Sequence, residues 1–283
     1  MYRHIEVALT AVDATSTRPL TLQNANIMIY EKADERLDYL IKSLMQDVPQ
    51  ARGLVVPTET DEKRRLLRAL MNVRPPLPAT PEFLTAQDEE LQIQLREKGI
   101  VEPSAEGITL WQGDITRLRT DAIVNAANSQ MLGCFVPLHG CIDNAIHSAA
   151  GIQLRQACHD IMQRQGHDEP TGQAKLTPAY NLPSRYVIHT VGPIVRGSAP
   201  SADDRRLLAD CYRNCLSLAD ETGLHSIAFC CISTGEFHFP NAQASEIAVD
   251  VVRRYLSSAK HLRSVVFNVF KDADREIYEK LLS

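Results

Sequence analysis

Three side chains able to bind a metal ion lie in one short loop near the middle of the chain: Cys134, His139 and Cys141. Two thiolates and one imidazole make a soft donor set, which favours zinc over magnesium or calcium. Pro137 and Gly140 allow the loop to turn, so the three side chains can face one point. Three protein ligands leave a tetrahedral ion with one open position, as in catalytic zinc sites. The alternative interpretation is a buried cysteine pair and an unrelated histidine.

The donor set also limits what such an ion would do. Because two thiolates largely cancel its charge, it would be a milder Lewis acid than a zinc ion held by three histidines. Polarising a hydroxyl group of a bound substrate then suits it at least as well as generating free hydroxide. We expect Cys141 to lie at a helix start, where unpaired N–H groups favour its thiolate form.

Two further loops carry groups suited to an anionic ligand. The segment Ser233–Phe237 follows an apolar run, and its small residues let backbone N–H groups close around phosphate oxygens. Phe237 can pack on a sugar or a base. The alternative is a plain strand-to-helix turn with Asn241 as the helix cap. Asp114 could accept a hydrogen bond from an exocyclic amine, although taken singly it is better explained as a cap of the next turn.

The elements that position these loops alternate between strand and helix from about residue 108. Runs such as IAFCCI and VVFNVF are apolar on both faces, which predicts a sheet covered by helices on both sides. Ligands bind at the carboxyl ends of strands in such sheets, where the loops above are placed. The predicted strands are Ile108–Gln112, Ala122–Asn125, Lys175–Tyr180, Tyr186–Val191, Ser226–Ile232 and Ser264–Phe270. The predicted helices are Cys141–Ala150, Ile152–Gln165, Ala202–Thr222, Ala242–Ser258 and Ala273–Leu282.

The first hundred residues have a different character. Apolar residues recur at helical spacing around Leu40 and around Leu67, and four prolines between Pro75 and Pro81 then break the chain. A further helix is predicted from about Pro81 to Lys98, stopped by Gly99. We therefore expect a mainly helical N-terminal extension over residues 1–100 and a second domain over residues 101–283. No chemistry stands out in the extension, and the simplest prediction is that it packs on its neighbour.

Composition excludes several classes of protein. With 283 residues, 44% of them apolar and 23% charged, the chain is an ordinary globular mixture. A net charge of −5 argues against a general nucleic-acid binder. No apolar run is long enough to cross a membrane, and Glu6 and Asp13 interrupt any signal sequence in MYRHIEVALTAVDA. Seven cysteines, an odd number, indicate free thiols in a reducing compartment, so we expect a cytoplasmic protein.

Five short motifs give the chain a resemblance to the macrodomain family over roughly residues 108 to 283, in family order. That resemblance implies a three-layer α/β/α sandwich with a mixed central sheet, preceded by the helical extension. The segment GCFVPLHGC replaces the family's usual glycine-rich first loop and is similar to the zinc-dependent subfamily, which hydrolyses protein-linked mono-ADP-ribose. The five motifs are GDIT (Gly113–Thr116), NAAN (Asn125–Asn128), DNAIH (Asp143–His147), VIHTVGP (Val187–Pro193) and ISTGEFHFP (Ile232–Pro240).

The resemblance implies substrate contacts for individual residues. Asp114 would hold the adenine amino group with the Ile115 backbone beside it, and Asn268 would line the adenine pocket. Asn128 would bond to the distal ribose, and Asn125 of the same motif is also expected to bind substrate. Ser233, Thr234, Gly235, Glu236 and Phe237 would wrap the diphosphate, with Phe237 against the distal sugar.

The resemblance also implies the reacting groups. Cys134, His139 and Cys141 would hold one zinc ion beside the distal ribose, and Asp143 would orient or activate water. Asn128 and Glu236 complete the expected catalytic set. For the carboxyl group of Glu236, three roles are open: catalysis, contact with the metal site, or positioning only. His238 stands where many members have glycine, a departure that bears on the shape of the phosphate loop.

The implied activity is removal of single ADP-ribose units from modified side chains, ester-linked to Asp or Glu, by attack at either the anomeric carbon or the ester carbonyl. Two alternatives are a non-catalytic reader of ADP-ribose and a hydrolase of a small ADP-ribose derivative. The metal triplet favours the enzyme, because a reader has no use for a metal ion. The implied partner is a mono-ADP-ribosylated protein, with a lipoyl-carrier-like protein as a candidate.

Overall fold

The computed structural model describes residues 33–103 and 106–283. The amino-terminal stretch in which we expected no signal sequence lies outside these residues. The helices are α1 (Ala33–Asp47), α2 (Thr60–Val73), α3 (Pro81–Lys98), α4 (Ile142–Ala150), α5 (Ile152–Gln165), α6 (Ala202–Glu221), α7 (Asn241–Leu256) and α8 (Asp272–Leu282), with short 3₁₀ turns η1 (Pro49–Ala51) and η2 (Ile115–Arg117). The strands are β1 (Gly107–Gln112), β2 (Ala122–Ala127), β3 (Ala174–Pro178), β4 (Tyr186–Val191), β5 (Ser226–Phe229) and β6 (Ser264–Val269).

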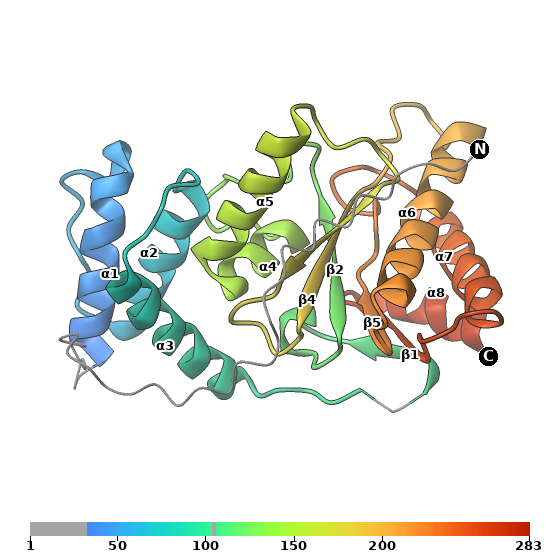
Figure 1. Cartoon of the computed structure of the whole chain (residues 1–283), viewed down its shortest axis with the longest axis horizontal. Helices are drawn as coiled ribbons and strands as arrows, with labels where there is room; N and C mark the ends of the chain where they lie inside the picture. Colours follow the sequence, from blue (N-terminus) through green and yellow to red (C-terminus); the bar gives the residue numbers. More distant parts are fainter. Residues whose placement is uncertain (1–32, 104–105) are drawn as a thin grey trace.

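The six strands form one sheet in the order β1-β6-β5-β2-β4-β3. All neighbouring pairs are parallel except β3 with β4, so the sheet is mixed. Helices α4 and α5 lie on one side of this sheet, and α6, α7 and α8 lie on the other (Figure 1). The predicted three-layer α/β/α arrangement is therefore confirmed.

Local signals explain where several helices begin. Thr80 caps α3 by accepting a hydrogen bond from Phe83 N–H, and Pro81 follows at the first helical position. Ser201 and Asp204 form a capping box at the start of α6. The plain-turn alternative for the loop after β5 required Asn241 to cap α7, and Asn241 does not do so. Instead Asn241 is the first residue of α7, and its side chain donates to Asp274.

The strand predictions are confirmed in number and order, with one shift of functional interest. The sequence predicted a strand up to Ile232, but β5 ends at Phe229. Residues 230–232 leave the sheet early and lead into the loop that begins at Ser233. Among the residues that the structure describes, no helix is long and apolar enough to cross a membrane.

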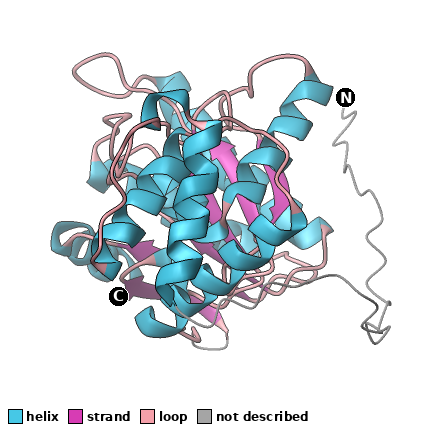
Figure 2. Ribbon diagram, turned by 90° about the vertical axis from the view of Figure 1, so that its left-hand side faces the viewer, coloured by secondary structure: helices cyan, strands magenta, loops and turns pink. Residues whose placement is uncertain are grey.

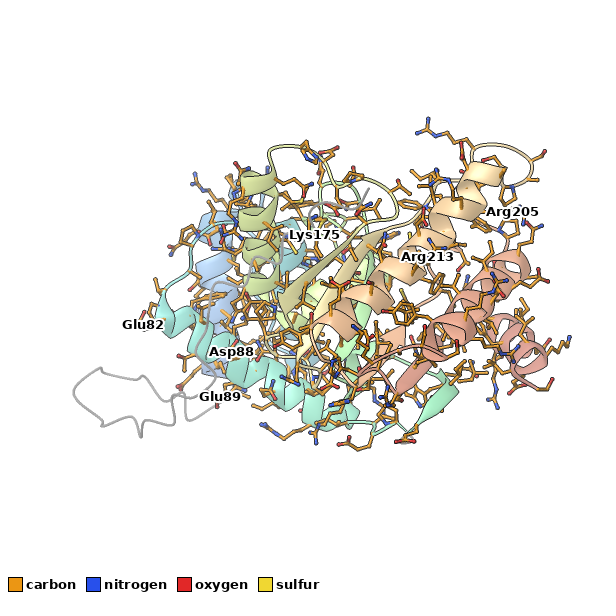
Figure 3. All side chains as sticks on the ribbon, turned by 45° about the vertical axis from the view of Figure 1, so that its right-hand side comes forward. Glu82, Asp88, Glu89, Lys175, Arg205 and Arg213 are labelled. Carbon is orange, nitrogen blue, oxygen red and sulfur yellow. The ribbon has the colours of Figure 1, made fainter. Side chains whose placement is uncertain are left out.

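The first three helices pack around an apolar core of their own, which includes Leu40, Leu67 and Met71 and also takes in Ile152 of α5. Figure 2 views the molecule from the side of these helices and shows them in front of the strands. Their outer faces are polar: Glu82 and Glu89 extend from α3 into solvent (Figure 3). The extension therefore packs on the rest of the chain, as predicted, while the domain boundary near residue 100 stays a prediction.

Candidate functional site

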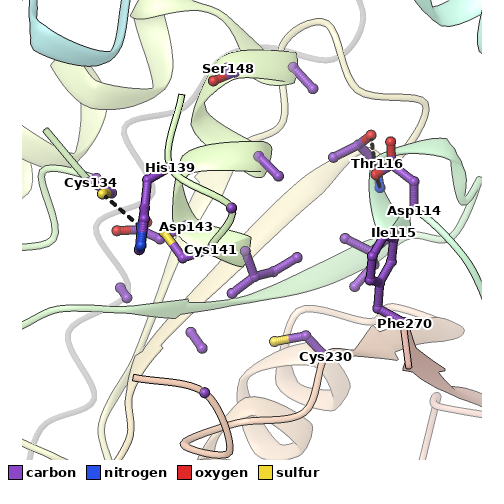
Figure 4. A pocket seen from close by; sticks show the side chains of 18 of the residues that line it. Asp114, Ile115, Thr116, Cys134, His139, Cys141, Asp143, Ser148, Cys230 and Phe270 are labelled. Carbon is purple, nitrogen blue, oxygen red and sulfur yellow. Dashed lines mark hydrogen bonds between the residues drawn. The ribbon is translucent and has the colours of Figure 1, made fainter. Parts of the chain in front are cut away.

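A cavity of about 1270 Å³ opens at the carboxyl ends of the parallel strands. Its lining includes the loops after β1, β2 and β5, the start of α4, and residues of α2 and α3. Two groups of side chains lie at opposite ends of it (Figure 4). Asp114, Thr116 and Phe270 lie at one end, and Cys134, His139, Cys141 and Asp143 lie at the other.

The metal-binding candidates converge at one end of this cleft. One donor atom from each of Cys134, His139 and Cys141 lies within 4.8 Å of the other two, and all three side chains are half-buried. The Cys134 sulfur is 3.6 Å from Nδ1 of His139. Two soft sulfurs and one imidazole nitrogen at such spacing fit a tetrahedral zinc ion with a position open to the cleft. The alternative of an unrelated histidine does not hold, because His139 contacts Cys134 directly.

Cys141 caps the start of α4, as expected, with its sulfur accepting from Asn144 N–H at 3.4 Å. The N–H group of Asn144 favours the thiolate of Cys141, as the sequence suggested, but it is not the largest influence on the thiol. Burial raises the pKa of the Cys141 thiol to about 12, and the nearby Cys134 adds to the rise, which outweighs the single N–H group. A bound cation is the group that would favour the thiolate form here.

Asp143 lies one residue beyond the cap, with its carboxyl group beside His139 and Cys141 (Figure 4). Its side chain is only 7% exposed, and burial raises its pKa to about 6. Oδ1 of Asp143 accepts a hydrogen bond from Nδ2 of Asn125 at 2.8 Å and lies 3.5 Å from Nε2 of His147. Asp143 is therefore held from behind while it reaches the cleft.

Asn125 lies behind Asp143, and it does not occupy the substrate-binding position that we expected. It is fully buried and does not line the cavity, because its side chain points from β2 toward α4, in the layer between sheet and helix. Its Nδ2 bonds to Asp143 and lies 3.2 Å from Nδ1 of His189, whose Nε2 lies 2.9 Å from Oγ1 of Thr177. Asn125 thus links Asp143 to a buried network and makes no contact with the cleft.

The same network contains two buried histidines, His147 and His189, which lie near Cys158. His189 has both ring nitrogens engaged by Asn125 and Thr177, which leaves no free nitrogen for a metal ion. Burial lowers the pKa of His189 to about 3 and holds that of His147 well below 6.5. Both imidazoles are therefore neutral in the folded protein near neutral pH.

Acidification is expected to destabilise the fold through His189. Its folded-state pKa of about 3 lies below the unfolded value of 6.5, so only the unfolded chain gains a proton in that window. The contribution of the neutral His189 to the free energy of unfolding is fully present above about pH 6.5 and is lost as the pH falls toward 3. We expect the free energy of unfolding to drop by roughly 2 kcal/mol on this account between pH 7 and pH 5. Urea unfolding of the parent and of His189→Asn at both pH values measures the difference, and equal losses in the two would contradict it.

The opposite end of the cleft is organised around Asp114. Its Oδ1 accepts from the N–H and hydroxyl groups of Thr116, so Asp114 caps η2 as a turn residue would. Its Oδ2 is 3.3 Å from the ammonium group of Lys98. Burial opposes ionisation, but the bonds from Thr116 and the charge of Lys98 outweigh it and lower the pKa of Asp114. Both capping and ligand binding are open to this residue, because its carboxyl group also lines the cavity.

Other residues at this end support the same surface. Asn268 lines the cavity near its base and donates to the carbonyl oxygen of Gly113 at 2.9 Å, which joins β6 to the loop after β1. Ile115 lines the cavity while being almost fully buried. Phe270 lies beside Ile115 (Figure 4) and is 76% exposed, although the sequence analysis did not single it out. Its position just after the last strand was the signal for it.

The loop after β5 has the geometry of an anion-binding nest. Ser233 has a left-handed backbone, with φ of 65°, and its side chain packs closely against Gly192. Within the described part of the chain, the N–H groups of residues 234–237 make no hydrogen bond to protein. Four successive free donors beside the cleft suit the oxygens of a diphosphate. His238 adopts φ of 57°, a conformation that glycine adopts more readily, so the departure at this position is accommodated.

Two expected catalytic residues have additional contacts. Asn128 stabilises its own loop: its oxygen accepts from Gln130 and Met131 N–H groups, and its Nδ2 donates to Gly133. Glu236 is 72% exposed and its Oε1 is 3.7 Å from Nε2 of His139. The carboxyl group of Glu236 thus lies next to the imidazole of His139, at the metal-binding end of the cleft.

Although no chemistry stands out in the sequence of the extension, its helices contribute to the lining of the cleft. Helices α2 and α3 form a wall of the cleft and bring basic side chains to it: Arg64, Arg65, Arg68 and Lys98. The three arginines are far in sequence from the loop that carries Cys134, His139 and Cys141, and Lys98 is separated from Asp114 by a further stretch of chain. Only tertiary packing brings these residues to the same cleft. Three of the four lie in one short stretch of α2, Arg64–Arg68, and this clustering was the available signal.

The comparisons with known proteins agree with this geometry. The family model described as "Macro domain" matches residues 124–248. A protein-ADP-ribose hydrolase of Treponema medium is 50% identical over 258 residues, covering 88% of this chain and 98% of that protein. The chain belongs to the macrodomain family. A protein-ADP-ribose hydrolase of Staphylococcus aureus (strain MRSA252) is 47% identical over 250 residues, covering 87% of this chain and 94% of that protein.

The macrodomain fold is also matched by solved structures. A macrodomain of Trypanosoma brucei in complex with ADP-ribose has a TM-score of 0.55 and 30% identity, covering 91% of this chain and 93% of that one. The macrodomain resemblance expected from the five motifs is therefore confirmed. The roles of the individual residues in the cleft remain proposals.

Proposed function

We propose that this macrodomain protein is a zinc-dependent hydrolase that removes mono-ADP-ribose from modified Asp or Glu side chains of proteins. The observation that carries this proposal is the convergence of Cys134, His139 and Cys141 at one end of a cleft whose other end carries Asp114. The relatives named as protein-ADP-ribose hydrolases support the same reaction.

One end of the cleft binds the ADP portion of the substrate, and the other end carries the reacting groups. Asp114, Ile115 and Asn268 hold the adenine, and the free N–H groups of residues 234–237 hold the diphosphate. This anchoring places the distal ribose against Asn128 and Phe237, so that binding of the remote ADP portion is used to orient the reacting bond.

Cys134, His139 and Cys141 would hold the zinc ion at this end of the cleft, and Asp143 is the residue that we assign to act on water. When bound, zinc supplies Lewis acidity toward a ribose hydroxyl, moderated by two thiolates. Asp143 orients the attacking water and accepts its proton as the ester bond breaks, which leaves ADP-ribose and the free carboxyl group of the modified side chain. Asn125 fixes the carboxyl group of Asp143 from behind. Glu236 lies within reach of His139 and helps to hold that ligand.

Two other functions use the same cleft. A non-catalytic reader of ADP-ribose would need Asp114, Asn128 and the nest but no metal ligands. A hydrolase of a small ADP-ribose ester would need all of them and no surface for a protein. The half-buried metal-binding triplet favours an enzyme, and the wall formed by the extension favours a protein substrate, of which a lipoyl-carrier-like protein is our candidate. All seven cysteines are free, which fits the proposed cytoplasmic location.

Removal of the metal ion is expected to stop the reaction. Protein treated with a strong chelator should release no labelled ADP-ribose from a protein modified on acidic side chains, and added zinc should restore release. The physical reason is that the distal ribose loses the cation that polarises it. Scintillation counting of released ADP-ribose measures the effect.

The outcomes of this assay separate the three candidate functions. Equal release with and without chelator would contradict the metal-dependent mechanism. Binding of ADP-ribose without any release would identify a reader. Release from an acetyl ester of ADP-ribose but not from modified protein would identify the small-molecule hydrolase.

A further inference from the structure

The metal-binding loop is held in place by a helix that lies far away in sequence. Helix α2 of the extension lies beside α4 (Figure 1), and Asn72 near its end is only 1% exposed. Oδ1 of Asn72 accepts a hydrogen bond from Leu138 N–H at 2.9 Å, and Nδ2 donates to Oγ of Ser148 at 2.9 Å. One amide thus joins the loop directly before His139 to the helix that begins after Cys141.

A second side chain of α2, that of Arg68, holds the backbone of the residue after Leu138. Nη2 of Arg68 donates to the backbone oxygen of His139 at 3.3 Å and to Oδ1 of Asn144 at 2.8 Å. Asn144 in turn donates from Nδ2 to the backbone oxygen of Val136 at 3.0 Å. Three backbone groups of the loop, at Val136, Leu138 and His139, are therefore fixed by side chains of α2 and α4.

The loop needs this support because its backbone is strained. Leu138 has φ of 58°, a left-handed conformation that residues with a side chain rarely adopt without help from their surroundings. Its N–H bond to Asn72 holds that conformation, and the residue that follows is the histidine ligand. A change of φ at Leu138 would change the direction in which the chain enters His139, whose Nδ1 is now 3.6 Å from the sulfur of Cys134.

We propose that Asn72, assisted by Arg68, is a positioning residue for the metal site, so that the helical extension completes the site on which the reaction depends. This inference rests on the metal-dependent function proposed above. It assigns the extension a defined role: α2 sets the affinity and geometry of the three-ligand site without touching the ion. Loss of a group that orients a ligand typically weakens metal affinity by about 10- to 100-fold.

The chain offers a matched control for Asn72. Gln87 of α3 is also a buried amide of the extension, and its Oε1 accepts from Ile152 N–H at 3.0 Å while its Nε2 donates to Oε1 of Gln153 at 2.7 Å. It therefore makes the same kinds of bonds to the macrodomain but none to the metal loop. Asn72→Leu and Gln87→Met remove equivalent hydrogen bonds at similar volume.

The test is metal binding by the full chain, measured by competition with a chromophoric chelator for zinc, and by the absorption spectrum of the cobalt-substituted protein. We expect Asn72→Leu to bind zinc about tenfold more weakly or worse and to change the cobalt spectrum, which reports ligand geometry. Gln87→Met should bind zinc as tightly as the parent does. The temperature at which the metal-free protein unfolds should be lowered in both variants. Asn72→Asp, which keeps the acceptor for Leu138 N–H, should restore most of the affinity.

Equal zinc affinity and an unchanged cobalt spectrum in Asn72→Leu would overturn the positioning role, as would an equal loss in Gln87→Met. If Asn72→Leu does not fold, Arg68→Met gives the same comparison at a half-buried position and should also weaken zinc binding. A parent protein that binds no zinc at all would overturn the metal-dependent function itself, so the two failures are distinguishable.

Discussion

Replacing Cys134 by alanine is expected to abolish release of ADP-ribose from a modified protein while free ADP-ribose still binds. Cys134 supplies one of three donor atoms that lie within 4.8 Å of each other. Two remaining ligands bind zinc far more weakly, whereas Asp114 and the nest at residues 234–237 are unchanged. We expect turnover to fall by at least about 1,000-fold, a size consistent with loss of a principal transition-state interaction. Turnover assays and calorimetric titration with ADP-ribose measure the two properties separately.

A second cysteine provides the control for this prediction. Cys215 is fully buried in α6, away from the cavity, so Cys215→Ala removes a thiol without touching the site. It should lower stability somewhat and leave turnover close to that of the parent. Turnover by Cys134→Ala at the level of Cys215→Ala would contradict a metal-binding role for Cys134.

Asp143→Asn is expected to lower turnover by about 10²- to 10⁴-fold, the usual contribution of a general acid or base. The replacement keeps the shape of the side chain, and its amide oxygen can still accept the hydrogen bond from Asn125. The amide cannot accept a proton from water, so the chemical step should fail while zinc content and ADP-ribose affinity are retained. Single-turnover kinetics, elemental analysis and ligand titration check these three expectations.

Glu236 gives the comparison that assigns the base. Its side chain is 72% exposed, and its 3.7 Å contact with His139 is screened by solvent. Glu236→Gln should therefore reduce turnover far less than Asp143→Asn does. A larger loss in Glu236→Gln would exchange the two roles and make Glu236 the residue that acts on the attacking water.

The substitutions at Asp143 and Asn72 separate two ways in which the site can fail. Asp143→Asn removes a reacting group and leaves the metal ion in place, whereas Asn72→Leu weakens the hold on the ion and leaves every reacting group present. Excess zinc should rescue Asn72→Leu and have no effect on Asp143→Asn, because only the first defect is one of occupancy.

The sequence by itself determined the features that depend on neighbours along the chain. Apolar runs and helical spacing predicted the order of strands and helices, since these patterns record which faces are buried. Cys134, His139 and Cys141 could be grouped because one short loop brings them together. The carboxyl ends of β1, β2 and β5 identified where a ligand would lie.

Only the tertiary structure decided which polar side chains reach the cleft and which lie behind it. Asn125 belongs to a motif expected to bind substrate, but its side chain points toward α4, where it holds Asp143. Arg68 and Asn72 looked like ordinary helix residues, yet they contact the metal loop across separations of 71 and 66 residues. The physical reason is that a hydrogen bond between distant segments depends on how two helices pack, and local sequence patterns do not record that packing.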